Sequence, residues 1–120
     1  MKTTIKWNAD LFGVEIEGED MHFVIDAHPS YAMSWHDAVR FYTDNKVWQL
    51  PTRKQLELIA ENIDEVNDLI KANGGYEMYS YHWTADADNE FCAWRVDMYD
   101  GYTISGNKYN YDYVRAVSAL

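Results

Sequence analysis

Hydrophobic and polar positions alternate along the first 26 residues of the chain in three short bursts. Alternation with a period of two is typical of a strand with one buried face. Turn-forming residues at 8–10 and 17–20 separate the bursts, so the pattern predicts three short antiparallel strands. The apolar positions are Ile5 and Trp7, then Phe12, Val14 and Ile16, then Met21, Phe23 and Ile25.

After Ser34 the period changes to that of a helix. Ser34 and Asp37 stand at the cap and at the third position of a predicted helix over about residues 35–44. A second helix is predicted after Thr52, because Thr52 and Gln55 have the spacing of a capping box. Its apolar face consists of Leu56, Ile59, Ala60 and Ile63.

A third helical stretch follows, with Asp64 as its candidate cap and Asn73-Gly74-Gly75 as its stop. The strand pattern then returns over residues 79–85, 91–98 and 113–119, with Asp100-Gly101 as a turn. Strands, then two or three helices in the first half, then strands again predict one α+β domain over residues 1–120. We expect its N- and C-terminal strands to share a sheet.

The composition of the chain fits one folded domain. Its 120 residues are 48% hydrophobic and 16% aromatic, which is enough for one core. No apolar run approaches the length of a membrane span, and none follows the first lysines as in a signal peptide. These features predict a cytoplasmic or particle-associated protein with no membrane insertion.

The net charge of the chain limits the kinds of partner that we expect. Ten Lys and Arg against 20 Asp and Glu give a formal net charge of −10. A negative surface repels phosphate backbones and anionic lipid, so we expect neither nucleic acid nor a membrane surface as partner.

Tyrosine is distributed unevenly. Eight of the ten tyrosines lie between Tyr76 and Tyr113, in a segment that is also rich in Asn and Asp. Tyrosine rings give rigid contact area and Asn gives adaptable hydrogen bonds, a combination typical of recognition surfaces. The alternative is that the tyrosines are half-buried strand residues and the Asn and Asp make turns. Residues 107–112 have no apolar side chain except tyrosine rings, which is unlike a core segment.

An ordered series of motifs covers about residues 30–120. The motifs are Ser34-Trp35 with Asp37-Ala38, Trp48-Gln49-Leu50-Pro51-Thr52 with Gln55-Leu56, Tyr81-His82-Trp83-Thr84, Ala93-Trp94, Asp100-Gly101, Asn107-Lys108 and Tyr113-Val114-Arg115-Ala116-Val117. The series resembles the bacterial and phage domain of unknown function found at the C terminus of the collagen-like lipoprotein Lcl. This chain departs from the family pattern at Gln49 and at His82-Trp83-Thr84.

The resemblance implies a C-type-lectin-like fold of the formylglycine-generating-enzyme branch. In such a fold the loops between the late strands form an outer face. The residues implied for the core are Trp48, Leu50, Trp83, Trp94, Val114 and Val117. Some members of the family resemble the variable proteins of diversity-generating retroelements, in which adenine-directed mutagenesis rewrites codons of the ligand-binding face. The residues that fit this bias are Tyr99, Tyr102, Ser105, Asn107, Tyr109, Asn110, Tyr111 and Asp112.

Catalytic and metal chemistry find little support in the sequence. The single Cys92 excludes the paired-thiol chemistry of formylglycine-generating enzymes and is expected to be a small buried residue. A Cys92–His82 pair lacks a third, orienting group. The four histidines have no zinc spacing. Asp86, Asp88 and Glu90 are a weak calcium candidate, but the EF-hand pattern and the sugar-site motifs of calcium-dependent lectins are absent.

The sequence therefore predicts a non-enzymatic ligand- or receptor-binding domain without a cofactor. The loops around residues 86–90 and 99–112 would form its face, and the ligand would be a protein or a glycan. The alternative is a structural or assembly module of a phage or bacterial surface particle, with the same face as a subunit interface in an oligomer.

Overall fold

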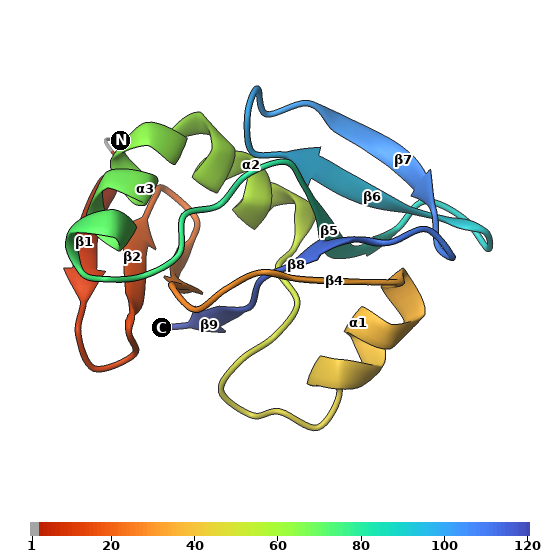
Figure 1. Cartoon of the computed structure of the whole chain (residues 1–120), viewed down its shortest axis with the longest axis horizontal. Helices are drawn as coiled ribbons and strands as arrows, with labels where there is room; N and C mark the ends of the chain where they lie inside the picture. The colour runs from red at the N-terminus through yellow and green to blue at the C-terminus, as the bar shows by residue number, and fades with distance from the viewer. Residues whose placement is uncertain (1–2) are drawn as a thin grey trace.

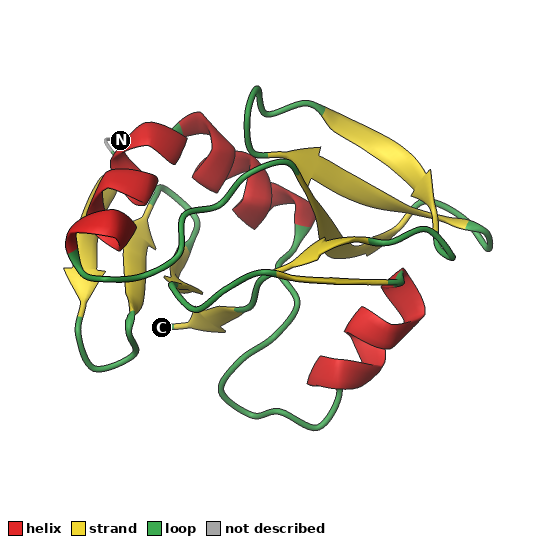
Figure 2. Cartoon of the chain, viewed as in Figure 1, coloured by secondary structure: helices red, strands yellow, loops and turns green. Residues whose placement is uncertain are grey.

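Two β-sheets and three helices make up residues 3–120, the part of the chain that the computed structural model describes (Figures 1 and 2). The strands are β1 (Thr4–Asn8), β2 (Gly13–Glu17), β3 (His22–Asp26), β4 (Tyr31–Met33), β5 (Tyr81–Ala87), β6 (Cys92–Asp97), β7 (Thr103–Asn107), β8 (Asp112–Val114) and β9 (Val117–Ala119). The helices are α1 (Trp35–Tyr42), α2 (Arg53–Glu61) and α3 (Ile63–Ala72). None of these helices has the length and apolar character needed to cross a membrane.

The first sheet, sheet A, has the strand order β1-β2-β3-β9, and every neighbouring pair is antiparallel. Its first three strands are the three that the alternating pattern predicts. Val14 and Ile16 of β2 and Ile25 of β3 are fully buried, on the side where α3 packs. Val117 of β9 lies opposite Ile25, so the prediction that the terminal strands share a sheet is confirmed.

The second sheet, sheet B, has the strand order β4-β8-β5-β6-β7 and lies to the right of sheet A in Figure 1. β8 runs parallel to β5, with His82 opposite Tyr113, and the other pairs are antiparallel. Helix α1 packs against β5, and α2 packs against β5 and β6. Sheet B therefore has helices from two separate parts of the chain beside it.

The helix starts agree with the capping signals. The Ser34 hydroxyl accepts from the Asp37 N–H at 3.4 Å, and both bonds of the capping box between Thr52 and Gln55 form. The boundary between α2 and α3 was predicted wrongly, because α2 ends at Glu61 and Asn62 leaves helical geometry at φ −120°.

Two residues next to this boundary take different places from those predicted. Ile63 belongs to α3, not to the face of α2. Asp64 stands inside the first turn of α3 and is not its cap. There its carboxylate interacts favourably with the positive end of the helix dipole.

The strand predicted over residues 113–119 is two strands in different sheets. β8 ends at Val114 and β9 begins at Val117, and Arg115-Ala116 carries the chain from sheet B to sheet A. All five residues at 114–118 are buried, so both faces of the chain are covered there and an alternating pattern could not show the break. β4 and β7 were not predicted.

Buried side chains form two clusters, a larger one between sheet A and helices α2 and α3 and a smaller one around Trp83. Of the six residues implied for the core, four are buried: Leu50, Trp83, Val114 and Val117. Trp48 and Trp94 are only half-buried, and the Arg53 guanidinium covers the Trp94 ring at 4.6 Å. Cys92 is also partly exposed, so the prediction of a buried cysteine is wrong.

Candidate functional site

The predicted tyrosine face is divided between the two ends of the β6–β7 hairpin. Tyr99 and Tyr102 lie in the turn from β6 to β7, whereas Tyr109 and Tyr111 follow the far end of β7 (Figure 1). The intervening strand has five residues, or about 17 Å at ~3.4 Å per residue. Residues 99–111 are thus turn, strand and turn, Asp112 begins β8, and the eight predicted residues do not form one loop face.

Three turns meet at the far end of β7. The Lys108 N–H donates to the Phe91 carbonyl at 2.9 Å, and the Trp35 N–H donates to the Lys108 carbonyl at 3.0 Å. These bonds join the β7–β8 connection to the β5–β6 turn and to the start of α1. The side chains of Tyr109, Tyr111 and Phe91 are 75%, 69% and 64% exposed here. We call these three residues the aromatic end.

The buried side chain of Lys108 links the segments that carry the aromatic end. Its side chain is only 7% exposed, and its Nζ donates to the Glu90 carbonyl at 3.1 Å and lies 4.5 Å from the centre of the Trp35 ring. The Asn107 side chain accepts from the Tyr109 N–H at 2.9 Å, as in an Asx turn. The turn is therefore fixed in backbone while its tyrosine rings remain exposed.

Other predicted site residues have structural partners. The Asp112 carboxylate lies 3.2 Å from the Arg95 guanidinium, which covers the Tyr81 ring at 4.5 Å. Burial raises the pKa of Asp112, and Arg95 opposes this effect. Ser105 lies within β7 and is partly buried, whereas Asn107 and Asn110 are exposed beside the aromatic end.

The weak calcium candidate does not assemble. The Asp86 carboxylate accepts the Arg53 N–H at the start of α2 at 2.6 Å, so it is occupied by the helix end. Asp86, Asp88 and Glu90 are exposed, and residues 3–120 contain no group of three or more His, Cys, Asp or Glu side chains able to hold a metal ion.

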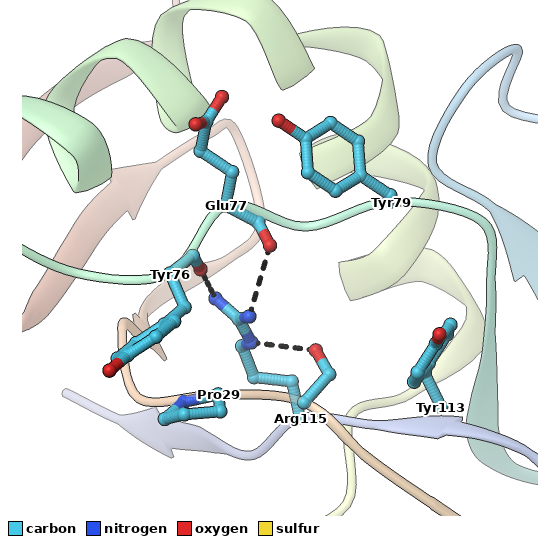
Figure 3. A pocket seen from close by; sticks show the side chains of 7 residues that line it. Pro29, Tyr76, Glu77, Tyr79, Tyr113 and Arg115 are labelled. Carbon is cyan, nitrogen blue, oxygen red and sulfur yellow. Dashed lines mark hydrogen bonds between the residues drawn. The ribbon is translucent and has the colours of Figure 1, made fainter.

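A pocket that the sequence reasoning missed lies at the junction of the two sheets (Figure 3). Its volume is about 230 Å³. The lining residues come from the β3–β4 connection, the segment before β5, and β8 with the residue after it: Pro29, Ser30, Tyr76, Glu77, Tyr79, Tyr113 and Arg115. We call it the Arg115 pocket.

Arg115 forms the polar floor of this pocket and is only 2% exposed. Its Nη1 donates to the carbonyls of Asp26 and Tyr76, and its Nη2 donates to the Glu77 carbonyl at 3.3 Å. Within residues 3–120 no carboxylate lies within ion-pair distance of its guanidinium. Burial lowers the pKa of Arg115 to about 10, so the side chain stays charged at neutral pH.

A chain of hydrogen bonds runs from Arg115 into the protein. The Arg115 Nε donates to the Ser30 hydroxyl at 2.9 Å, and the Ser30 oxygen lies 2.8 Å from Nε2 of the fully buried His82. Nδ1 of His82 lies 3.3 Å from the Ser80 carbonyl, which can only accept. Nδ1 therefore carries the proton, and Ser30 donates to Nε2.

His82 is neutral in this arrangement. Burial, together with the positive charge of Arg115, lowers the pKa of His82 to about 3. Ser30 and His82 have the spacing of a nucleophile and its base, but an imidazole with this pKa cannot take up the serine proton at neutral pH.

The tyrosine excess is the one sequence signal that points to this pocket. Tyr76, Tyr79 and Tyr113 lie in the tyrosine-rich segment and line the pocket. Ser30 and His82 are 52 residues apart, and no local motif links them.

Comparison with known proteins does not identify the chain. No family model matches it, and no curated protein matches its sequence significantly. The fold and the two regions define a small α+β protein with an exposed aromatic end and a separate polar pocket.

Proposed function

We propose that this protein is a non-enzymatic binding domain that recognises a protein receptor through the aromatic end. The observation that carries the proposal is the exposure of Phe91, Tyr109 and Tyr111 together on turns whose backbone is fixed. Exposed aromatic rings on a rigid support lose little conformational entropy on binding, and tyrosine is one of the residue types enriched in the hot spots of protein interfaces.

A C-type-lectin-like fold is part of the proposal. Its support is the order of the motifs over about residues 30–120, together with terminal strands that share sheet A and late strands that form a separate sheet B. In that fold the loops between the late strands form an outer face, and the proposal assigns the β5–β6 and β7–β8 turns of this chain to that face.

The same geometry accommodates sequence diversification. Tyr109, Asn110 and Tyr111 are exposed, while the neighbouring Lys108 and the Asn107 side chain hold the backbone. Side chains at 109–111 can therefore change without disturbing the core. A nearby reverse transcriptase and a near-copy of the codons for residues 80–117 that differs at adenines would identify a diversified receptor-binding surface. Without them the surface is fixed.

The proposal that the domain is non-enzymatic is supported by the state of the Ser30–His82 pair. His82 is fully buried beside a permanent positive charge, so the imidazolium that acyl transfer requires would be strongly disfavoured. An assay of ester hydrolysis tests this part of the proposal. Wild type and Ser30→Ala should hydrolyse an activated ester at the same background rate.

Affinity capture with matched variants tests the proposed surface. Wild type, Tyr109→Ala/Tyr111→Ala and Tyr99→Ala/Tyr102→Ala would each be used to retain proteins from bacterial surface extracts. We expect a protein that wild type and the Tyr99/Tyr102 control retain and that the Tyr109/Tyr111 variant binds at least about tenfold more weakly. Equal loss with both variants would contradict the proposal.

The assembly alternative predicts a different result in solution. If the aromatic end were a subunit interface, light scattering of the purified protein would show closed oligomers that depend on concentration and on Tyr109 and Tyr111. The receptor proposal predicts that wild type and the Tyr109/Tyr111 variant are both monomers at every concentration.

A further inference from the structure

We infer that the Arg115 pocket is a second binding site, which takes a small ligand with a carboxylate group and a flat apolar body. The inference is independent of the proposed function, because the pocket shares no residue with the aromatic end. Its basis is the combination of an open pocket, a buried unpaired cation and aromatic walls.

The positive charge of Arg115 favours an anionic ligand. A buried cation is expensive unless an anion or several hydrogen bonds compensate it. Here carbonyl and hydroxyl oxygens accept its hydrogen bonds, but none of them carries a negative charge. The Asp26 carboxylate attracts the guanidinium only from beyond ion-pair distance. An anion that enters the pocket would place a negative charge in direct contact with it, where the attraction is stronger.

The guanidinium also keeps a donor for the ligand. Arginine has five N–H bonds in a planar fork, and four of those of Arg115 have acceptors within residues 3–120. The remaining N–H belongs to Nη2, and Arg115 is one of the residues that line the pocket. In Figure 3 the carboxylate of Glu77 is turned away from the guanidinium, and the Glu77 carbonyl faces it. The side of Arg115 that faces the pocket therefore carries positive charge without a competing carboxylate in contact.

The walls of the pocket select the body of the ligand. Tyr79 and Tyr113 lie across the pocket from Tyr76 and Pro29, with the guanidinium between the two groups (Figure 3). Tyrosine rings favour flat apolar groups and place phenol hydroxyls at the rim. A volume of about 230 Å³ is below the roughly 300–1,000 Å³ of sites for drug-sized molecules, so the ligand is small.

The hydrogen-bond network beneath the pocket makes the site ready for a ligand. The Ser30 hydroxyl is held between Arg115 and His82, and the His82 ring lies 5.7 Å from the Tyr113 ring. His82 stays neutral and hydrogen-bonded, so it adds no second positive charge and keeps Ser30 in place. Such preorganisation reduces the entropy lost on binding.

Benzoate and benzamide are matched probes for this site, because they share one ring and differ in charge. Each would be added to ¹⁵N-labelled full-length protein while amide resonances are followed by NMR. We expect benzoate to shift the resonances of Ser30, Tyr76 to Ser80 and Tyr113 with a Kd on the order of 1 mM, and benzamide to bind at least about tenfold more weakly. Equal binding of both probes would show an apolar cleft and overturn the inference, as would the absence of saturable shifts.

Variants locate the effect in the pocket. Tyr113→Leu removes one aromatic wall and should weaken benzoate binding at least about threefold, whereas Tyr102→Leu, a tyrosine in the β6–β7 turn, should leave it unchanged. Arg115→Lys keeps the charge but loses the fork and should weaken binding at least about fivefold if it folds. Unchanged binding in the folded Tyr113→Leu protein would overturn the assignment, whatever the fate of Arg115→Lys.

Discussion

Two buried cations organise the two candidate regions, and they differ in what lies over them. Lys108 is covered by the Trp35 ring and donates to one carbonyl, so it serves as a support beneath the exposed aromatic end. Arg115 makes four hydrogen bonds yet faces an open pocket. A covered cation fixes a surface for a partner, whereas a cation at the floor of a pocket can itself meet a ligand.

Removing each cation should separate the two roles, and Arg115 should give the largest effect. Arg115→Met leaves three backbone carbonyls and Ser30 without their donor, so we expect a loss of about 2–4 kcal/mol in the free energy of unfolding. Lys108→Met loses one hydrogen bond and one cation–π contact and should cost about 1 kcal/mol. Urea denaturation measures both. Equal losses would contradict the difference between the two cations.

The pH dependence of stability should report on the Arg115 region through His82. A histidine in the unfolded chain takes up its proton near pH 6.5, whereas burial holds the pKa of His82 at about 3 in the folded protein. The unfolded chain therefore binds more protons between these values, and the free energy of unfolding falls as the pH drops through this window. This contribution is complete above pH 6.5, and its slope is at most about 1.4 kcal/mol per pH unit.

His82→Gln should remove this part of the slope. His22→Gln is the matched control, because His22 lies on the surface beside Glu15 and should leave the slope due to His82 in place. A slope between pH 4 and 6.5 that is the same in wild type and His82→Gln would show that His82 is protonated in the folded protein.

Ser30→Ala should have an intermediate effect. The substitution leaves the Arg115 Nε without an acceptor and the buried His82 Nε2 without a donor, so we expect a loss of about 1–2 kcal/mol. Thermal unfolding of the variant measures this loss. If stability were unchanged, the hydrogen-bond chain would not contribute to the fold.

The smallest effect is expected at the aromatic end. Tyr109→Ala/Tyr111→Ala removes two exposed rings and should change the free energy of unfolding by less than about 0.5 kcal/mol per residue. A large drop in Tm would show that these tyrosines are part of the packed structure.

Much of the fold was predictable because local signals agree with the final contacts. The alternation in residues 1–26 and the caps at Ser34 and Thr52 each lead to the observed element. The break between β8 and β9 at Arg115-Ala116 was not predictable, because burial on both sides of the chain there removes the alternating pattern. β7 was missed because its sequence, Thr-Ile-Ser-Gly-Asn, contains only one large apolar residue and therefore shows no alternating pattern.

The candidate site was predictable only in part, for a related reason. Composition shows that tyrosines cluster between Tyr76 and Tyr113, but it does not show which of them lie together. The hairpin places Tyr99 and Tyr109 at opposite ends, and the sheet junction brings Tyr76 to Arg115. The pairing of Ser30 with His82 and Arg115 depends on contacts 52 and 85 residues apart, which no local pattern records.

An NMR footprint of the captured partner tests the proposed surface most directly. The partner would be added to ¹⁵N-labelled protein, and the broadened amide resonances would be mapped onto the structure. We predict broadening at residues 89–91 and 107–111, with the β6–β7 turn and sheet A unaffected. Broadening centred on residues 98–102 or on sheet A would show that the aromatic end is not the binding surface.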